Sequence, residues 1–312
     1  MVAVIGVLLY PANSSGGLPD RACWGSIDAA VLENAAPQQG DWHVKESTDQ
    51  WGDPTCTLRK GSWEADVTVM KTPLRSHLWW QLGSASLGGD LPGMVKPGAH
   101  RTDGWLDLPQ CGDRLVNANV PAADVNDAAS ADLTARLLLA VGNTRASGCG
   151  GAPFPVPAAF DWDATARPHQ IVTDPCGITG LPAAGNGGAG GLVQVGRLDP
   201  HAAVSRCSVL REDESAGDAV AGPGLFAVTV VRDRATLDAL SPTGIRTSVT
   251  VTPGASPAFT DEDLRYDRDG VTELSCGPER RYVHVITTGS DADYTASKRA
   301  ALNAIAAGMN CG

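Results

Sequence analysis

The sequence contains the stretch DGWLDLPQCG at residues 103–112 and a related stretch, DGVTELSCG, at residues 269–277. Each begins with an Asp-Gly pair, continues through a largely apolar segment and ends at a Cys-Gly pair. Asp-Gly is the strongest short signal for a two-residue hairpin turn, because both central residues of that turn need a positive φ angle. We therefore expect Asp103-Gly104 and Asp269-Gly270 to form hairpin turns, each leading into a strand that ends at a cysteine.

The eight cysteines extend this similarity to the rest of the chain. Their sequence separations are 33, 55 and 38 in the first group of four, and 31, 69 and 35 in the second. The strand-like segment ADVTVM at 65–70 also resembles AVTVV at 227–231. Similarity at such a fixed spacing indicates an internal repeat. We expect an α+β protein of two tandem repeats, each with helices packed on a mostly antiparallel sheet.

The cysteine spacing also predicts a disulfide framework. An even number of cysteines in an exported chain is typical of disulfides, although the sequence alone leaves the connectivity open. If both repeats use one pairing, the simplest choice joins the first cysteine to the second and the third to the fourth. The predicted pairs are Cys23–Cys56, Cys111–Cys149, Cys176–Cys207 and Cys276–Cys311. The alternative, a zinc site, needs clustered Cys or Cys/His spacings that the sequence lacks.

The chain divides into four predicted segments. They are an apolar leader with a linker (1–22), the first repeat (23–150), a Pro- and Ala-rich connector (151–173) and the second repeat (174–312). The run MVAVIGVLLY at Met1–Tyr10 is shorter than the roughly 20 apolar residues of a membrane-spanning helix. It also lacks the basic start of a signal peptide. We expect the remnant of a signal anchor or signal peptide; the alternative is a buried first strand.

Hydrophobic periodicity predicts the main elements. The predicted strands are Val67–Val69, Leu115–Val120, Phe226–Val231 and Tyr282–Thr287. The predicted helices are Ile27–Asn34 capped by Ser26, a short counterpart at Thr179, one carrying Leu133, Leu137, Ala140 and Val141, and one carrying Tyr294, Leu302, Ile305 and Met309. Because side chains alternate along a strand, Tyr282, His284 and Ile286 should share one face of their sheet, with Val283 and Val285 on the other.

The formal net charge of −11 limits the classes of partner. Phosphate binding needs clustered Lys and Arg, so an acidic chain disfavours nucleic acid and anionic membrane surfaces. We expect no nucleic-acid partner, and membrane contact only through the N-terminal apolar segment.

Motifs that could carry chemistry are better explained as structure. Residues 185–190 (GNGGAG) match G-x-G-x-x-G but lack the preceding strand and following helix of a dinucleotide site. The acidic cluster at 261–269 fails as a calcium loop, because Arg265 and Cys276 occupy ligand positions one and twelve. The six histidines have no partner at metal spacing, and no G-x-S-x-G frames a nucleophile. We expect no catalytic residues, metal or cofactor.

Tryptophan is distributed unevenly between the two predicted repeats. The first holds seven of the eight: Trp24, Trp42, Trp51, Trp63, Trp79, Trp80 and Trp105. These rings either supply the aromatic core of the first repeat or include an exposed binding platform. Neighbouring residues on a strand point to opposite faces, so Trp79 and Trp80 are the candidates for a binding surface.

The stretch Asp174-Pro175-Cys176-Gly177-Ile178-Thr179, with Cys207 about thirty residues on, resembles the start of domains in an uncharacterised family of actinobacterial secreted lipoproteins. Cys23-Trp24-Gly25-Ser26-Ile27 and Cys56 match this pattern more loosely. The resemblance implies a cell-envelope location and an α+β fold, and it implies no catalytic residues. The chain departs from the family because it is duplicated and lacks a lipobox, which puts lipid anchoring in doubt.

These observations favour a non-enzymatic, extracytoplasmic protein that is secreted or anchored to the membrane through its N-terminus. It would bind a small ligand or an envelope partner. Two alternatives remain open: a secreted enzyme, such as a hydrolase, with an unrecognised site, and a purely structural component of the envelope.

Overall fold

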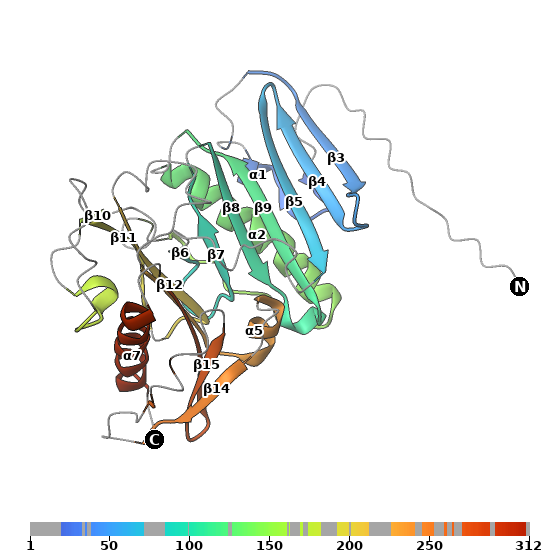
Figure 1. Ribbon diagram of the computed structural model, residues 1–312. Coiled ribbons are helices and arrows are strands. Elements are labelled where there is room, and N and C mark those ends of the chain that lie inside the picture. The colour runs from blue at the N-terminus through green and yellow to red at the C-terminus, as the bar shows by residue number, and fades with distance from the viewer. Residues whose placement is uncertain are drawn as a thin grey trace, which may run out of the picture.

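A computed structural model describes residues 20–32, 35, 39–71, 85–98, 100–123, 127–160, 162, 169–170, 174–181, 192–199, 201–211, 226–240, 245–252, 259–260, 264, 270–287 and 291–309. These residues form a mixed α+β structure with two seven-stranded sheets that lie side by side (Figure 1). We call the first sheet with its helices the first lobe, and the second sheet with its helices the second lobe.

The first sheet is antiparallel throughout, with the strand order β3-β4-β5-β9-β8-β7-β6. Its strands are β3 (Trp42–Thr48), β4 (Pro54–Lys60), β5 (Trp63–Lys71), β6 (Ala85–Ser86), β7 (Gly93–Lys96), β8 (Arg101–Asp107) and β9 (Arg114–Pro121). Before it come the small hairpin of β1 (Arg21–Ala22) and β2 (Ile27–Asp28) and the short helix α1 (Ala29–Leu32). The 3-10 helix η2 (Pro109–Cys111) joins β8 to β9, and helix α2 (Ala128–Gly148) follows β9.

The second sheet has the strand order β10-β11-β12-β13-β16-β15-β14, and all its pairs are antiparallel except β14–β15. Its strands are β10 (His169–Gln170), β11 (Leu192–Arg197), β12 (Val204–Arg211), β13 (Phe226–Val231), β14 (Ile245–Thr250), β15 (Val271–Cys276) and β16 (Glu279–Thr287). The second lobe also contains η3 (Pro175–Gly177), α5 (Arg234–Leu240) and α7 (Asp291–Ala307).

Most of the predicted strands and the two long helices are confirmed. Val67–Val69 lies within β5, Leu115–Val120 within β9 and Tyr282–Thr287 within β16, and β13 is Phe226–Val231. Leu133, Leu137 and Val141 of α2 are buried, as are Tyr294 and Leu302 of α7. On β16, Val283 and Val285 belong to the core of the second lobe, whereas Tyr282 belongs to an apolar cluster on the other face, as alternation predicts.

The prediction of a hairpin turn at Asp103-Gly104 is wrong. Both residues lie inside strand β8, which ends at Asp107 and is followed by Cys111 in η2. A Cβ at Gly104 would come within 2.8 Å of Thr134 Cγ2 on α2. The glycine therefore allows the helix to approach the sheet closely, which is a recognised use of glycine within a strand. In the second stretch, β15 begins just after Gly270 and ends at Cys276, and Asp269 lies outside the described residues.

The first predicted helix is also shorter than expected. Ile27 pairs with Ala22 in the β1–β2 hairpin, and α1 begins only at Ala29. The backbone N–H of Ser26 donates to the carbonyl of Ala22 at 3.0 Å, so Ser26 closes a hairpin turn and does not cap a helix. The region that would continue the short helix at Thr179 lies outside the described residues.

The core of the first lobe forms between the sheet and α2. Alternate residues of β4 and β5, such as Leu58 and Val67, are fully buried in it together with Leu137 and Leu138 of α2. Trp162 is buried in the same core, with the ring of Phe160 stacked on it at 5.1 Å. The second core is formed by α7 and residues of β12, β13 and β16.

Three disulfides lie wholly within the described residues, and they are three of the four predicted pairs. They join Cys23 to Cys56, Cys111 to Cys149 and Cys176 to Cys207. Cys276 is also disulfide-bonded, and its predicted partner, Cys311, lies outside the described residues. Such bonds persist in oxidising compartments, so they indicate an extracytoplasmic environment.

Replacing both Cys111 and Cys149 by Ala should lower the free energy of unfolding by roughly 2–4 kcal/mol, because the unfolded chain regains the freedom of that loop. The midpoint of urea unfolding, measured by circular dichroism, tests this. A control variant, Cys111→Ser alone, should react with a thiol reagent, whereas the wild-type protein should not. An unchanged midpoint in the double variant would show that the bond adds nothing to the stability of this lobe.

Candidate functional site

The face of the first sheet opposite α2 changes from polar to apolar across the sheet, from β3 toward β7. Near β3, β4 and β5 it is polar, whereas its other end carries the apolar residues Met94, Trp105 and Leu115, which are buried against the second lobe. We call this side the outer face. Its polar end is exposed over much of its area.

The strand register places the polar side chains of this end in rows. His43 on β3 lies opposite Arg59 on β4, which lies opposite Glu64 on β5. In the adjacent row, Lys45 lies opposite Thr57, which lies opposite Asp66. Directly opposed side chains on antiparallel strands lie about 5 Å apart at Cβ, so each row can act as a unit.

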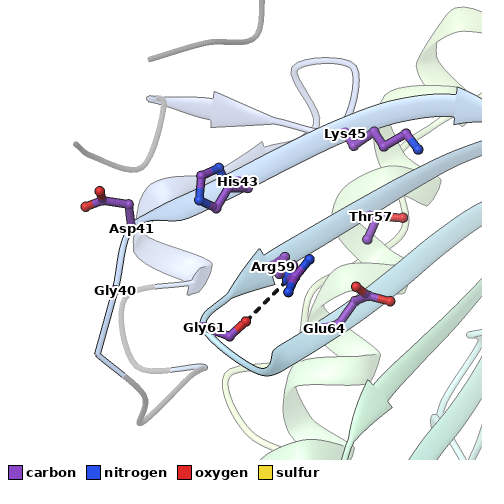
Figure 2. Close-up of a pocket in the computed structure, with 8 residues that line it drawn as sticks. All are labelled: Gly40, Asp41, His43, Lys45, Thr57, Arg59, Gly61 and Glu64. Atoms are coloured by element: carbon purple, nitrogen blue, oxygen red, sulfur yellow. Dashed lines mark hydrogen bonds between the residues drawn. The ribbon is translucent and has the colours of Figure 1, made fainter. Parts of the chain in front are cut away.

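A groove of about 760 Å³ opens at this end of the outer face. Figure 2 shows that its lining residues come from three neighbouring strands and from the segments next to them. The lining residues are Gly40, Asp41, His43, Lys45, Thr57, Arg59, Gly61 and Glu64.

Aromatic packing on the inner face holds these strands in place. Trp42 precedes His43 on β3 and is buried, and Trp63 precedes Glu64 on β5 and is also buried. The two rings meet edge to face with their centroids 5.4 Å apart. Pairs of this geometry stabilise by about 0.5–1.5 kcal/mol beyond the burial of their area. The apolar pair therefore fixes the positions from which His43 and Glu64 project to the opposite side.

The charged groups of the groove are only lightly engaged by the protein itself. Nε of Arg59 donates to the carbonyl of Gly61 at 3.2 Å, as the dashed line in Figure 2 marks. Within the described part of the chain, the side chains of His43, Lys45 and Glu64 make no hydrogen bond or ion pair. The remaining guanidinium N–H groups of Arg59 and the ammonium group of Lys45 therefore face the groove as available donors.

The second row is ordered by contacts farther along the sheet. The Thr57 hydroxyl donates to Asp66 at 2.7 Å, and Arg101 forms an ion pair with Asp66 at 3.7 Å. Arg101 also donates to Asn119, which in turn donates to Asp103. This network occupies the carboxylates next to the groove, so Asp66 does not compete for the cations of Lys45 and Arg59.

The arrangement suits a ligand that is both anionic and rich in hydroxyl groups. Arginine and lysine donate to carboxylate, phosphate or sulfate oxygens, and such charge-assisted hydrogen bonds are about twice as strong as neutral ones. The carboxylates of Asp41 and Glu64 can accept hydrogen bonds from hydroxyl groups on the same ligand.

The predicted binding surface at Trp79 and Trp80 lies outside the described residues, so it stays a prediction. Of the other tryptophans of the first lobe, Trp42, Trp63 and Trp105 are buried, whereas Trp51, in the turn between β3 and β4, is 56% exposed. Among the described residues, no group of three or more His, Cys, Asp or Glu side chains is placed to hold a metal ion. The described helices include none of the length and hydropathy that a membrane crossing requires.

The sequence reasoning missed the groove, although a signal for it exists. In β3 and β4, the polar residues His43, Lys45, Thr57 and Arg59 occupy alternate positions between residues that face the core. This alternation predicts one polar face per strand. The alternation does not show which residue of β3 lies opposite which residue of β4, because the strand pairing determines that.

A second polar row lies inside the protein, on the second sheet. Arg206 on β12, Thr229 on β13 and His284 on β16 are opposed in register, and each is about 1% exposed. Nη1 of Arg206 donates to the Thr229 hydroxyl at 3.2 Å. Burial, and to a smaller extent the positive charges of Arg206 and Lys298, lowers the pKa of His284 to about 3. The imidazole is therefore neutral at physiological pH.

The neutral state of His284 should make the second lobe sensitive to acid. Its pKa in the folded protein is far below the value of about 6.5 of an unfolded chain, so stability is lost as the pH falls from about 6.5 toward 3. In NMR spectra, the His284 imidazole should show no titration between pH 8 and pH 5. A midpoint near pH 6.5 would contradict this result, and the His284→Gln variant assigns the signal.

The chain matches no protein-family model, no curated protein and no solved structure.

Proposed function

We propose that this chain is a non-enzymatic binding protein of the bacterial cell envelope, and that it holds an acidic, hydroxyl-rich ligand in the groove of the first lobe. The observation that carries the proposal is the row of His43, Arg59 and Glu64 beside Lys45 and Thr57, where donors and acceptors face one open groove. An acidic saccharide has the matching chemistry, because its carboxylate, phosphate or sulfate groups accept hydrogen bonds and its hydroxyl groups donate them.

The location outside the cytoplasm is supported by the disulfides Cys23–Cys56, Cys111–Cys149 and Cys176–Cys207. Cytosolic thiols are kept reduced, so a chain with several disulfides belongs to an oxidising compartment. The resemblance of the cysteine-containing segments to actinobacterial envelope lipoproteins favours the same location. Anchoring through Met1–Tyr10 remains part of this proposal.

We further propose that the two lobes descend from one duplicated unit. The central strands of the first sheet occur in the order β3-β4-β5-β9-β8, and those of the second in the order β11-β12-β13-β16-β15. In both sheets, corresponding strands have the same order along the chain and the same neighbours. The last strand of each series is followed by a long helix, α2 after β9 and α7 after β16. Cys56 and Cys207 occupy the second strand of their respective series. If the two copies diverged on the outer face of the sheet, the groove would occur in the first lobe without a counterpart in the second.

The ligand class can be tested on an array that pairs each uronic-acid oligosaccharide with its carboxyl-reduced, neutral counterpart. The wild-type protein should bind the acidic member of a pair at least tenfold more tightly, and this preference should weaken as salt is added. The double substitution Lys45→Ala/Arg59→Ala should lower the affinity for acidic members by about tenfold or more. Isothermal calorimetry on the best pair gives both affinities.

A matched control removes two positive charges elsewhere. Arg21 and Lys71 are exposed and do not line the groove, so Arg21→Ala/Lys71→Ala should bind like the wild-type protein. Equal losses in the two double variants would mean that net charge, and not the groove, governs binding. Equal binding of the acidic and neutral oligosaccharides would refute the proposed ligand class.

A further inference from the structure

The junction between the two lobes contains a buried carboxyl group. Asp107 is the last residue of β8 and is 1% exposed. Its Oδ2 accepts a hydrogen bond of 3.0 Å from the hydroxyl of Thr236 on α5, a residue 129 positions later in the chain. This contact joins the first sheet directly to a helix of the second lobe.

The surroundings of this contact are apolar. Trp105 and Leu115 of the first sheet pack there against Leu237 of α5 and against Val231 and Tyr282 of the second sheet. Oδ1 of Asp107 is buried and, among the described residues, has no hydrogen-bond partner. A buried charge with one of its two oxygens unsatisfied is costly, so the neutral carboxylic acid is the favoured form of such a group.

The electrostatic setting acts in the same direction. Burial, and to a smaller extent the negative charge of Asp233, raises the pKa of Asp107 to about 7, although the Thr236 hydroxyl and the Leu108 backbone act in the opposite direction. Asp233 itself accepts a hydrogen bond of 2.8 Å from the backbone N–H of Thr236, so its charge is held at the start of α5.

Other charged or titratable groups lie on every element around the junction. Arg234 and Asp238 on α5 form an ion pair at 2.8 Å, and Arg232 after β13 forms one with Asp90 before β7 at 2.9 Å. The others are Arg114 on β9, Glu273 on β15 and Tyr282 on β16. Of these and Asp233, only Asp233 has a resolved effect on the pKa of Asp107. Among the described residues, therefore, no positive charge stabilises the carboxylate of Asp107 within the junction.

Among the described residues, other polar contacts between the lobes lie toward β6 and β7, and they include the exposed ion pair of Arg232 with Asp90 at 2.9 Å. The Ser86 hydroxyl donates to the carbonyl of Val204 at 2.5 Å, and the N–H of Ala203 donates to the carbonyl of Gly89 at 2.8 Å. Both use neutral groups. They can hold one side of the junction at any pH, whereas the Asp107–Thr236 contact holds the α5 side.

We propose that Asp107 is a pH-responsive latch at the junction: the protonated carboxyl group stays buried against Thr236 of α5, whereas the ionised group favours an open junction in which water reaches its charge. The latch lets a neutral or alkaline medium loosen the α5 side of the junction while the β6 side stays closed. It is independent of the ligand groove, which lies at the opposite end of the outer face.

The raised pKa of Asp107 determines how opening of the junction depends on pH. A carboxyl group whose pKa is raised in the folded state destabilises that state as it ionises, because the open state binds fewer protons. Opening of the junction should therefore increase as the pH rises from about 4 to about 7, and should level off above that range. The increase is at most about tenfold per pH unit.

Hydrogen exchange of the α5 backbone amides measures this opening, once the rates are corrected for the intrinsic effect of pH. In the wild-type protein, the opening constant for α5 should rise on the order of tenfold or more between pH 5 and pH 7. In Asp107→Asn, which is isosteric with the protonated acid, it should stay flat. In Thr236→Val, the profile should shift to higher pH, because the hydroxyl that favours the carboxylate is gone.

The control is Asp113→Asn, which removes the same charge from an exposed turn next to β9 and should leave the wild-type profile unchanged. Amides of β16 report opening of the whole second lobe, and a rise there equal to the rise in α5 would overturn a local latch. An identical pH profile in Asp107→Asn and wild type would overturn the role of Asp107. If Asp107→Asn does not fold, an unshifted profile in Thr236→Val overturns the proposal.

Discussion

The first sheet must satisfy two different environments with the same strands, and much of the structure depends on this constraint. Its inner face is mainly apolar and packs on α2, as Leu58 and Val67 show. Its outer face is apolar only where the second lobe covers it, around Trp105 and Leu115, and is polar toward β3. A slip of one residue in a strand pair would exchange the two faces, so the burial of the inner face fixes the register strongly.

This division also explains where the ionisable groups lie. The groups of the groove remain at the open end of the outer face, where water and ligand can reach them. Asp107 lies at the junction between the lobes. His284 lies on β16, the strand that also carries Tyr282 of this junction. Burial favours the neutral form of both residues. Burial thus has opposite effects on the two pKa values, because one group is an acid and the other a base.

The strength of the sequence signals determined what could be predicted. The α+β class, the strand at Phe226–Val231 and the helix carrying Leu133 and Leu137 follow from long or strongly periodic segments, and the structure contains them. The Asp103-Gly104 pair misled because its turn signal is local, whereas the need for a small residue against α2 is set by tertiary packing. The two-stranded pairing of Ala22 with Ile27 overrode a helical pattern for a similar reason.

The candidate site was less accessible from sequence. Alternation marks His43, Lys45 and Arg59 as outward-facing residues, but only the pairing of β3, β4 and β5 places them beside one another. Asp107 was still harder to identify, because a lone acidic residue at a strand end is ordinary. Its burial arises from the docking of α5, which begins more than one hundred residues later and leaves no local trace.

The disulfides have a mechanical consequence as well as a thermodynamic one. Each of the three closes a loop of 31 to 38 residues within its lobe. A force that pulls on the two ends of the chain passes through the sulfur atoms and bypasses each loop. About 100–130 Å of chain per loop then stays unavailable for extension. The three loops together withhold about one third of the 312 residues from extension, and strand β3, which lies within the Cys23–Cys56 loop, would be shielded from the load.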